Sequence, residues 1–429
     1  MATVSWFRTR RKRADGRTMA RLSRAELQRL NRSKVVEAAR GEFAERGFGG
    51  ATIDGIAGRA GLTRGAVYSN FPGKRALYFT VLAELSRAAD PGPGAAARAR
   101  TAREALGAFA RAWVTRLPLV SGDPGDPAGE GRLPVDLLPE VLADERLRAV
   151  VSGLRRLDAL LLGLALERMD VLAPGRSALP GREAAVEGQA GARAAGSGRR
   201  VRVAEAALTT LRGASELAVA APGFVEPFDL VAVGEELAGL DLDDRWAPPP
   251  VVPPVQPADA PWPAGALSSG GDVSWPGSEP GGARAADGEA GSARARGLGA
   301  EGVGAEDGVV AVLGPLEAGA AEEAVRAAPP GVSVTVALVG GDPAEQAPLT
   351  RLWLADVTRC LREAFPPRAW PRLRVAYDET GALAAAAGVP AATDDTIAAV
   401  RVRDGRIVAR AEGSGACHAI ASSVRLATV

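Results

Sequence analysis

The chain has 429 residues, with 52 Lys and Arg side chains against 51 Asp and Glu, and a formal net charge of +1. A length of this order predicts two or three domains. Two cysteines and one histidine exclude a disulfide framework and most histidine-based zinc sites, so we expect neither a metal nor a cofactor. With neither a signal peptide nor a run of about 18 uncharged apolar residues, the protein is expected to be cytoplasmic and to make no contact with a membrane.

The N-terminal end of the chain is basic. Residues 1–90 carry 18 basic and 8 acidic side chains, a net charge of +10, whereas the remainder carries a net charge of −9. Such an asymmetry favours a polyanionic partner. Residues 1–22 have no helical periodicity and are predicted to form a flexible basic arm, which either follows DNA or serves only as a solubilising tail.

Start and stop signals for helices follow in close succession after the arm. Ser23 and Glu26 fit a capping box, which predicts a helix that ends near Gly47. Thr52 suits the N-cap of a second helix over residues 53–60, and Gly61 suits the left-handed position after its end.

Thr63 can cap a further short helix over residues 64–70, so that the two short helices form a helix-turn-helix. Ala66 and Val67 offer the buried face of this last helix. Its other face is then free to enter a major groove. That face consists of Arg64, Gly65, Tyr68 and Ser69.

Residues 51–74 closely resemble, in order and in spacing, the DNA-binding domain of TetR (tetracycline-repressor) family regulators, and residues 38–48 resemble the first helix of that domain. The one common variation is Asn70, where many members have His. Both side chains can hydrogen-bond a phosphate.

The resemblance implies a role for most residues of the motif. Thr52 and Lys74 would bind phosphates, while Tyr68 and Asn70 would hold the sugar-phosphate chain. The start of the last short helix would meet base edges, and Arg64 is the best candidate for a bidentate contact with guanine, worth about 1–3 kcal/mol of discrimination. The candidate DNA contacts are Thr52, Thr63, Arg64, Gly65, Tyr68, Ser69, Asn70 and Lys74. We expect no catalytic residue.

Residues 91–245 are rich in Ala, Leu and Arg and have helical periodicity. One leucine-rich face and one Val/Ala/Leu face are expected to be core: Leu154, Leu157, Leu161 and Leu164, then Val201, Ala204, Leu208 and Leu211. The Gly-rich stretch 173–198 is expected to be a loop. The family resemblance implies that this region forms a homodimer through its last helices and encloses a pocket for a small-molecule effector.

Residues 246–305 are dominated by Pro, Gly, Ala and Ser, and we predict a disordered linker with a stiff, polyproline-like first third. Strand-like runs begin after Gly308, and Asp404-Gly405 predicts a hairpin between two of them. The expected order is strand, helix, strand, helix, strand, hairpin and helix, which favours an α/β layered domain.

This order resembles thioredoxin-like and peroxiredoxin-like domains, and the stretch 377–413 looks like the second half of that fold. Two departures stand out. The sequence GPLEAG at residues 314–319 has no cysteine after the first strand, and two aspartates, Asp394 and Asp395, replace the usual proline before the third. Thiol chemistry requires a thiolate, and Cys360 lies on an apolar helix face, so the domain is predicted to be redox-inactive.

The sequence therefore predicts a multidomain protein: an all-α helix-turn-helix and helical regulatory region, a disordered linker, and an α/β thioredoxin-like domain. The predicted divisions are an arm (1–22), a DNA-binding domain (23–90), an effector-binding and dimerisation domain (91–245), a linker (246–305) and a thioredoxin-like domain (306–429). The function expected is that of a ligand-responsive homodimeric repressor that binds double-stranded operator DNA and is not an enzyme. The alternatives are a thioredoxin-like oxidoreductase or an interaction module, tethered to DNA by the N-terminal domain.

Overall fold

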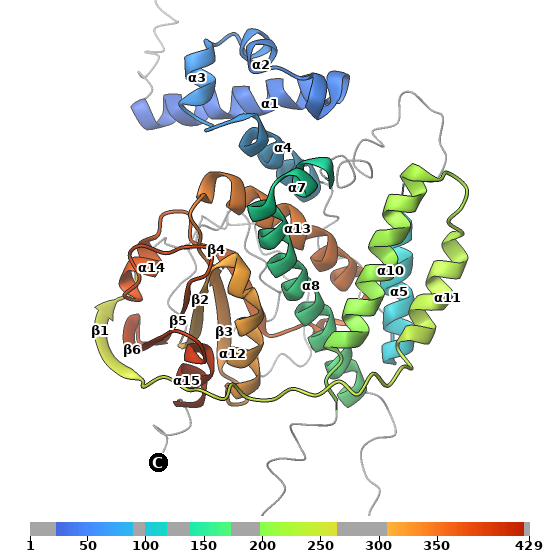
Figure 1. The fold of residues 1–429 in the computed structure, drawn as a ribbon, viewed down its shortest axis with the longest axis vertical. Coiled ribbons are helices and arrows are strands. Elements are labelled where there is room, and N and C mark those ends of the chain that lie inside the picture. The colour runs from blue at the N-terminus through green and yellow to red at the C-terminus, as the bar shows by residue number, and fades with distance from the viewer. Residues whose placement is uncertain (1–22, 89–98, 118–137, 173–197, 264–306, 424–429) are drawn as a thin grey trace, which may run out of the picture. The chain divides into compact units, whose positions relative to one another are not determined.

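The computed structural model of the chain describes residues 23–88, 99–117, 138–172, 198–263 and 307–423 (Figure 1). The chain folds as two compact units, Met1–Pro72 and Gly73–Val429. The predictions for the arm, for most of the loop 173–198 and for linker residues 264–305 lie outside the described residues.

The first unit consists of three helices, α1 (Arg24–Gly50), α2 (Ile53–Ala60) and α3 (Arg64–Tyr68). The predicted capping box at the start of α1 is confirmed: the side chain of Ser23 accepts the N–H of Glu26, whose carboxylate accepts the N–H of Ser23. Because Gly47 has a left-handed φ of 65°, the regular part of α1 ends there, as its sequence predicts.

The three helices share one small core. Val35 and Ala39 of α1, Ile56 of α2 and Val67 of α3 are all fully buried. The Arg32 guanidinium lies over the Phe71 ring, 4.2 Å from its centroid, and closes one side of this core. The predicted buried face of α3 is therefore confirmed at Val67.

Helices make up the first part of the second unit. They are α4 (Lys74–Ala88), α5 (Ala102–Val114), α7 (Leu138–Ala143), α8 (Glu145–Leu172), α10 (Val201–Ala220) and α11 (Pro227–Leu237). All eight predicted core positions on α8 and α10 are buried. No helix of the described ranges is long and apolar enough to cross a membrane.

A six-stranded sheet forms the second part of this unit, in the order β1-β6-β5-β2-β3-β4. The strands are β1 (Gln256–Pro261), β2 (Gly308–Leu313), β3 (Ser333–Leu338), β4 (Leu373–Tyr377), β5 (Ile397–Arg403) and β6 (Arg406–Glu412). Strands β2, β3 and β4 are parallel, and the other pairings are antiparallel. Asp404 and Gly405, with φ of 49° and 70°, form the predicted turn between β5 and β6.

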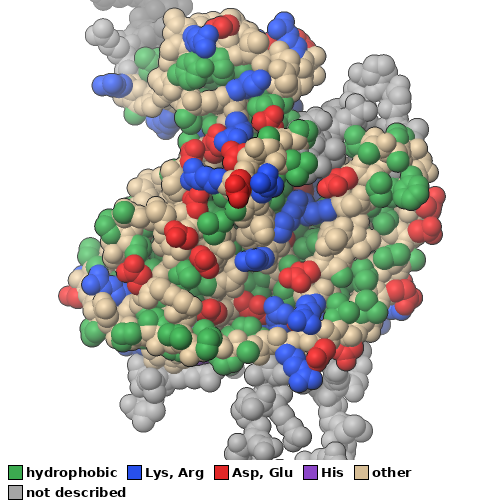
Figure 2. Space-filling model, in the orientation of Figure 1, with side chains coloured by type: hydrophobic (Ala, Val, Ile, Leu, Met, Phe, Trp, Pro, Cys, Tyr) green, Lys and Arg blue, Asp and Glu red, His purple; other side chains and the backbone are tan. Residues whose placement is uncertain are grey.

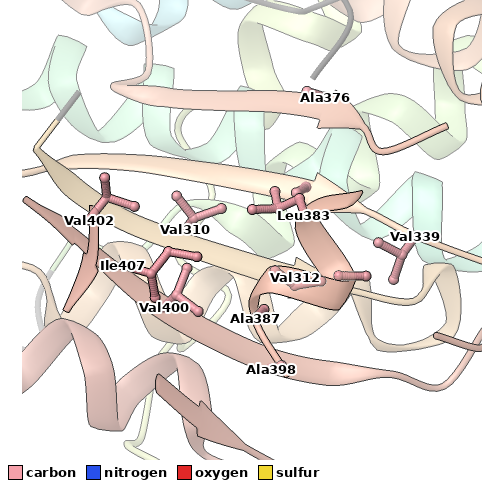
Figure 3. Close-up of a cluster of buried hydrophobic side chains, with 12 residues drawn as sticks. Val310, Val312, Val339, Ala376, Leu383, Ala387, Ala398, Val400, Val402 and Ile407 are labelled. Carbon is pink, nitrogen blue, oxygen red and sulfur yellow. The ribbon is translucent and has the colours of Figure 1, made fainter. Parts of the chain in front are cut away.

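Helices follow the strands in the predicted order, with one further short helix between β4 and the hairpin, where none was predicted. They are the 3-10 helix η1 (Pro315–Ala320), α12 (Ala321–Ala327), α13 (Pro343–Ala364), the 3-10 helix η2 (Pro367–Ala369), α14 (Ala382–Ala386) and α15 (Ala416–Ser423). Helices α12 and α15 pack on each other and on strands of the sheet. Figure 3 shows alternate residues of β2, among them Val310 and Val312, in the core under α14, where Leu383 and Ala387 join them.

The prediction of a disordered linker over residues 246–305 is wrong for residues 246–263. This stretch is extended, as its proline content predicts, but it then pairs with β6 as the edge strand β1. Prolines fit an edge because the N–H they lack is not needed on the open side. Asp259 forms an ion pair with Arg406 at 2.6 Å, and Trp262 packs against the core of the sheet.

Ion pairs join the helical and α/β parts of the second unit into one body. Five arginine–carboxylate pairs cross between these parts: Arg75–Glu345, Arg116–Glu363, Arg146–Asp394, Arg199–Glu322 and Arg326–Glu167. Helix α13 also packs along α4, α5 and α8. Helix α4 therefore groups with the second unit, although the sequence prediction places it in the DNA-binding domain.

Candidate nucleic-acid interface

The turn between α2 and α3 is fixed by two threonine caps. The Thr52 hydroxyl accepts the N–H of Gly55 at 3.0 Å, and the Thr63 hydroxyl accepts the N–H of Ala66 at 3.2 Å. Gly61 takes the left-handed conformation, with φ of 65°, at the end of α2. Both caps and the turn are therefore where the sequence predicts them, and they set the angle at which α3 leaves α2.

One face of α3 is open to solvent. Arg64, Gly65, Tyr68 and Ser69 are exposed, and Tyr68 exposes 44% of its surface. No atom of the described residues comes closer than 3.9 Å to a Cβ built on Gly65, so a large partner can approach the backbone here. Figure 2 shows Lys and Arg side chains spread over the face of the first unit in view.

Arg64 has partners within the first unit. Its Nη1 lies 3.1 Å from a carboxylate oxygen of Asp54, and its guanidinium lies over the Tyr68 ring at 5.6 Å from the centroid. A hydrogen bond with the Tyr68 hydroxyl and then the charge of Asp54 raise the pKa of Arg64 above its ordinary value. Both side chains of this pair are exposed, so the ion pair contributes little to stability.

Asp54 is a member of this site that the sequence prediction missed. The signal was available, because Asp54 lies at the start of α2 and Arg64 at the start of α3, which the turn brings together.

The predicted contacts at the end of α3 are used within the protein. The Asn70 side chain donates to the Ala66 carbonyl oxygen at 2.8 Å, and the Ser69 hydroxyl donates to the same oxygen at 2.9 Å. The Arg32 guanidinium donates to the carbonyl oxygen of Asn70 at 3.1 Å. Lys74 is the first residue of α4 and belongs to the second unit.

The close packing of α2 on α1 gives a testable prediction. A Cβ at Gly55 would overlap the carboxylate of the buried Glu42, which Arg46 and Arg59 hold at 3.1 and 3.5 Å. We expect Gly55→Ala to destabilise the first unit by about 1–3 kcal/mol. Gly58→Ala, on the same helix with no atom of the described residues near its Cβ, should instead be neutral or stabilise by about 0.5–1 kcal/mol.

Urea unfolding of the full chain, followed by hydrogen exchange of amides in α1 and α2, measures both effects. Equal protection in the Gly55→Ala and Gly58→Ala proteins would contradict the prediction.

The second unit contains a buried polar cluster, formed by Arg155 and Asp158 of α8, Arg212 of α10, Trp353 of α13 and Trp113 of α5. Asp158 is fully buried and accepts from Arg212 at 2.8 Å, and the nearest nitrogen of Arg155 lies at 3.6 Å. The two guanidiniums lie over the tryptophan rings, Arg155 at 4.8 Å from the Trp353 centroid and Arg212 at 5.0 Å from that of Trp113.

The charges of this buried polar cluster are incompletely satisfied. Burial raises the pKa of Asp158 well above its usual range and lowers the pKa of Arg155 to about 10. Within the described residues, one oxygen of Asp158, Nε of Arg212, Nη1 of Arg155 and Nε1 of Trp353 are buried without a hydrogen-bond partner. Buried polar atoms of this kind require a partner such as water or a polar ligand.

Neither cysteine side chain reaches the surface. Cys360 and Cys417 are fully buried. Burial raises the pKa of Cys360 to about 12, although Arg116 opposes this by donating to its sulfur, and burial also raises the pKa of Cys417. The described residues contain no group of three or more His, Cys, Asp and Glu side chains able to hold a metal ion.

The first unit thus has the architecture of a helix-turn-helix domain. Residues 35–81 match the family model for bacterial regulatory proteins, tetR family. Two relatives, both from Pseudomonas putida, are each 45% identical over 65 residues: the HTH-type transcriptional regulator SrpR and the uncharacterised HTH-type transcriptional regulator TtgW. The N-terminal region of the chain is therefore similar to the DNA-binding region of tetR-family transcriptional regulators.

These matches cover only a small part of the chain. They cover 15% of this chain, 30% of SrpR and 48% of TtgW, so the chain spans less than half the length of either relative. Among solved structures, the transcriptional regulator FadR from Bacillus subtilis, in complex with stearoyl-CoA, is 17% identical, with a TM-score of 0.23. That comparison covers 48% of this chain and 96% of FadR.

A TetR-family regulator from Mesorhizobium loti, described as putative, is 14% identical, with a TM-score of 0.22 over 51% of this chain and 96% of its own. At such TM-scores neither structure supports an argument about this chain.

Proposed function

We propose that the protein is a ligand-responsive homodimeric repressor that binds operator DNA through α3. The observation that supports this most is the solvent-exposed face of α3, which presents Arg64, Gly65 and Tyr68 beyond a turn that is fixed by two threonine caps. A face of this kind fits a major groove, where an arginine can pair with guanine. In this proposal, Thr52, Thr63, Ser69, Asn70 and Lys74 contact the DNA backbone, and the protein is cytoplasmic.

A homodimer is supported by apolar side chains that are open to solvent on the last helices of the helical part. Leu217 of α10 exposes 41% of its surface, Phe228 and Val233 of α11 expose 82% and 41%, and Phe224 between these helices exposes 72%. Figure 2 shows hydrophobic side chains on the surface over α10 and α11. Large exposed apolar groups are typical of interaction surfaces. A dimer formed through this surface would present two DNA-binding heads, one first unit from each copy, as a palindromic operator requires.

The effector is proposed to bind at the buried polar cluster. The unpaired oxygen of Asp158 can accept from an effector, and Arg155, Arg212 and Trp353 can donate to it. An effector that occupied this position would contact α8, α10 and α13 at once, and could shift the population between two arrangements of these helices.

We propose that the α/β part is a thioredoxin-like module without redox activity. The order and pairing of its strands support the fold, and the buried cysteines argue against an oxidoreductase. The two positions at which the sequence departs from the thioredoxin-like pattern, residues 314–319 and Asp394, both contact α8. Gly153 of α8 packs directly on the carbonyl of Pro315 in η1, and Asp394 accepts from Arg146 of α8 at 2.6 Å. In open α/β sheets, ligands bind outside the carboxyl ends of the strands, and here α8 covers this region.

Selection of bound fragments from random duplex DNA tests the proposed function. We expect enrichment of a palindrome whose half-sites lie about 10–10.5 base pairs apart, or a multiple of this spacing. We also expect the affinity for the palindrome to fall linearly with salt on a log–log scale, because phosphate contacts release counterions. Salt-dependent binding without any enriched sequence would refute the proposal.

A further inference from the structure

Helix α4 is the covalent link between the two units. The first unit ends at Pro72, and α4 begins at Lys74, so a single residue separates them. Any change in the direction of α4 must therefore be passed to the point where the first unit is attached.

The α/β part holds the start of α4. Nε of Arg75, on the first turn of α4, donates to both oxygens of Glu345 at 3.0 Å, and its Nη2 lies 2.7 Å from one of them. Nη1 of Arg75 donates to Asp144 at 2.8 Å. Glu345 lies in the first turn of α13, which belongs to the α/β part. The Arg75 and Glu345 side chains expose only 30% and 17% of their surfaces, and a bidentate pair of this kind fixes orientation as well as distance.

The same helix also holds the far end of α4. Arg359, on a later turn of α13, donates from Nη2 to the carbonyl oxygen of Ser86 at 2.8 Å and lies 3.1 Å from its hydroxyl. Between these two points, α13 packs along α4. Helix α4 is therefore held at both ends and along its length by a single helix.

Helix α13 also contributes to the buried polar cluster. Trp353, whose ring lies under the Arg155 guanidinium, is eight residues after Glu345 on α13. At 1.5 Å per residue this separation is about 12 Å. One continuous helix, which contains Pro348 between these two residues, thus joins the proposed effector position to the start of α4.

We infer that the α/β part sets the direction of α4, and with it the separation of the two DNA-binding heads of the dimer, through the pair Arg75–Glu345. This inference rests on the proposed function. Arg75 and Glu345 are positioning residues. They do not contact DNA, but by placing α4 they determine which spacer length between half-sites is preferred.

The test measures affinity for operators of different length. The palindrome selected by the wild-type protein is synthesised with its central spacer shortened or lengthened by one to three base pairs, and each duplex is titrated with wild type and with Glu345→Gln. The matched control is Glu167→Gln, because Glu167 accepts from Arg326 at 2.6 Å through both oxygens and links the same two parts without touching α4. The ratio of the affinities for two spacers, measured on one protein sample, does not depend on the fraction of that protein that is folded.

The wild-type and Glu167→Gln proteins are expected to discriminate between spacers to the same degree, whereas Glu345→Gln should lose about fivefold or more of this discrimination. Unchanged discrimination in Glu345→Gln, or an equal loss in both variants, would overturn the inference and leave the proposed function intact. If the wild-type protein selects no palindrome, both the proposed function and the inference fail.

Discussion

Replacement of Gly153 by alanine is expected to destabilise the second unit by about 1–3 kcal/mol or more. Gly153 is buried on α8, and a Cβ there would overlap the carbonyl oxygen of Pro315 and approach Ala318. A flexible side chain could rotate away from a new methyl group, but a backbone carbonyl cannot. Helix α8 and η1 would have to separate, which would disturb the packing of the helical part on the α/β part.

The matched control is Gly213→Ala on α10. No atom of the described residues lies within 4 Å of a Cβ at Gly213, and alanine in a helix is favoured over glycine by about 0.5–1 kcal/mol. The same chemical change in two helices of one unit should therefore shift stability in opposite directions. Urea unfolding followed by circular dichroism measures both shifts. Stabilisation by Gly153→Ala would show that α8 and η1 do not approach each other closely enough for a methyl group to clash.

Elements defined by a few adjacent residues could be predicted from the sequence. Thr52 and Thr63 cap helices through backbone N–H groups three residues ahead, and the turn at Asp404-Gly405 depends on its own two residues. Strands β2 to β6 were likewise found, because short apolar runs bounded by glycine carry their own signal.

Interactions between distant residues could not be predicted. Arg75 and Glu345 are 270 positions apart, and an arginine-rich sequence offers many equivalent partners for either. The pairing of β1 with β6 was missed for a related reason. The proline-rich sequence of β1 has the local pattern of an extended spacer. It forms a strand because the edge of β6 is free to pair with it. The buried polar cluster could not be predicted because its members come from α5, α8, α10 and α13, and no local sequence pattern connects them.

The exposed face of α3 was predicted from the sequence, but the contacts that its side chains make within the protein were not. The exposure of Arg64 and Tyr68 follows from helical periodicity, because Val67 must be buried. The engagement of Asn70 with Ala66 does not follow from it, since an amide can equally well face solvent. Asn70 contributes to the end of α3 in the protein alone, so its proposed contact with DNA uses the second N–H of the amide or a rearranged side chain.

The second large effect is expected at α3, which carries the proposed DNA contacts. If the proposed function holds, Arg64→Ala combined with Tyr68→Ala should lower the affinity of the proposed dimer for its operator by about 2–6 kcal/mol, because the proposed bidentate contact with guanine, of about 1–3 kcal/mol, is lost in each half-site. The loss should be confined to the specific sequence. Binding to an unrelated duplex depends on phosphate contacts and should weaken much less.

Asp54→Ala is the informative control for this double variant. It removes the internal partner of Arg64, 3.1 Å away, and leaves the guanidinium in place with one negative charge fewer on the first unit. Operator affinity should therefore be retained or increased, most clearly at low salt, where the repulsion between a carboxylate and phosphates is least screened. Fluorescence anisotropy with the operator and with a scrambled duplex, at several salt concentrations, separates the specific from the non-specific part. If Asp54→Ala lowers operator affinity as much as the double variant does, the ion pair itself is required for binding, and Arg64 does not exchange Asp54 for a base.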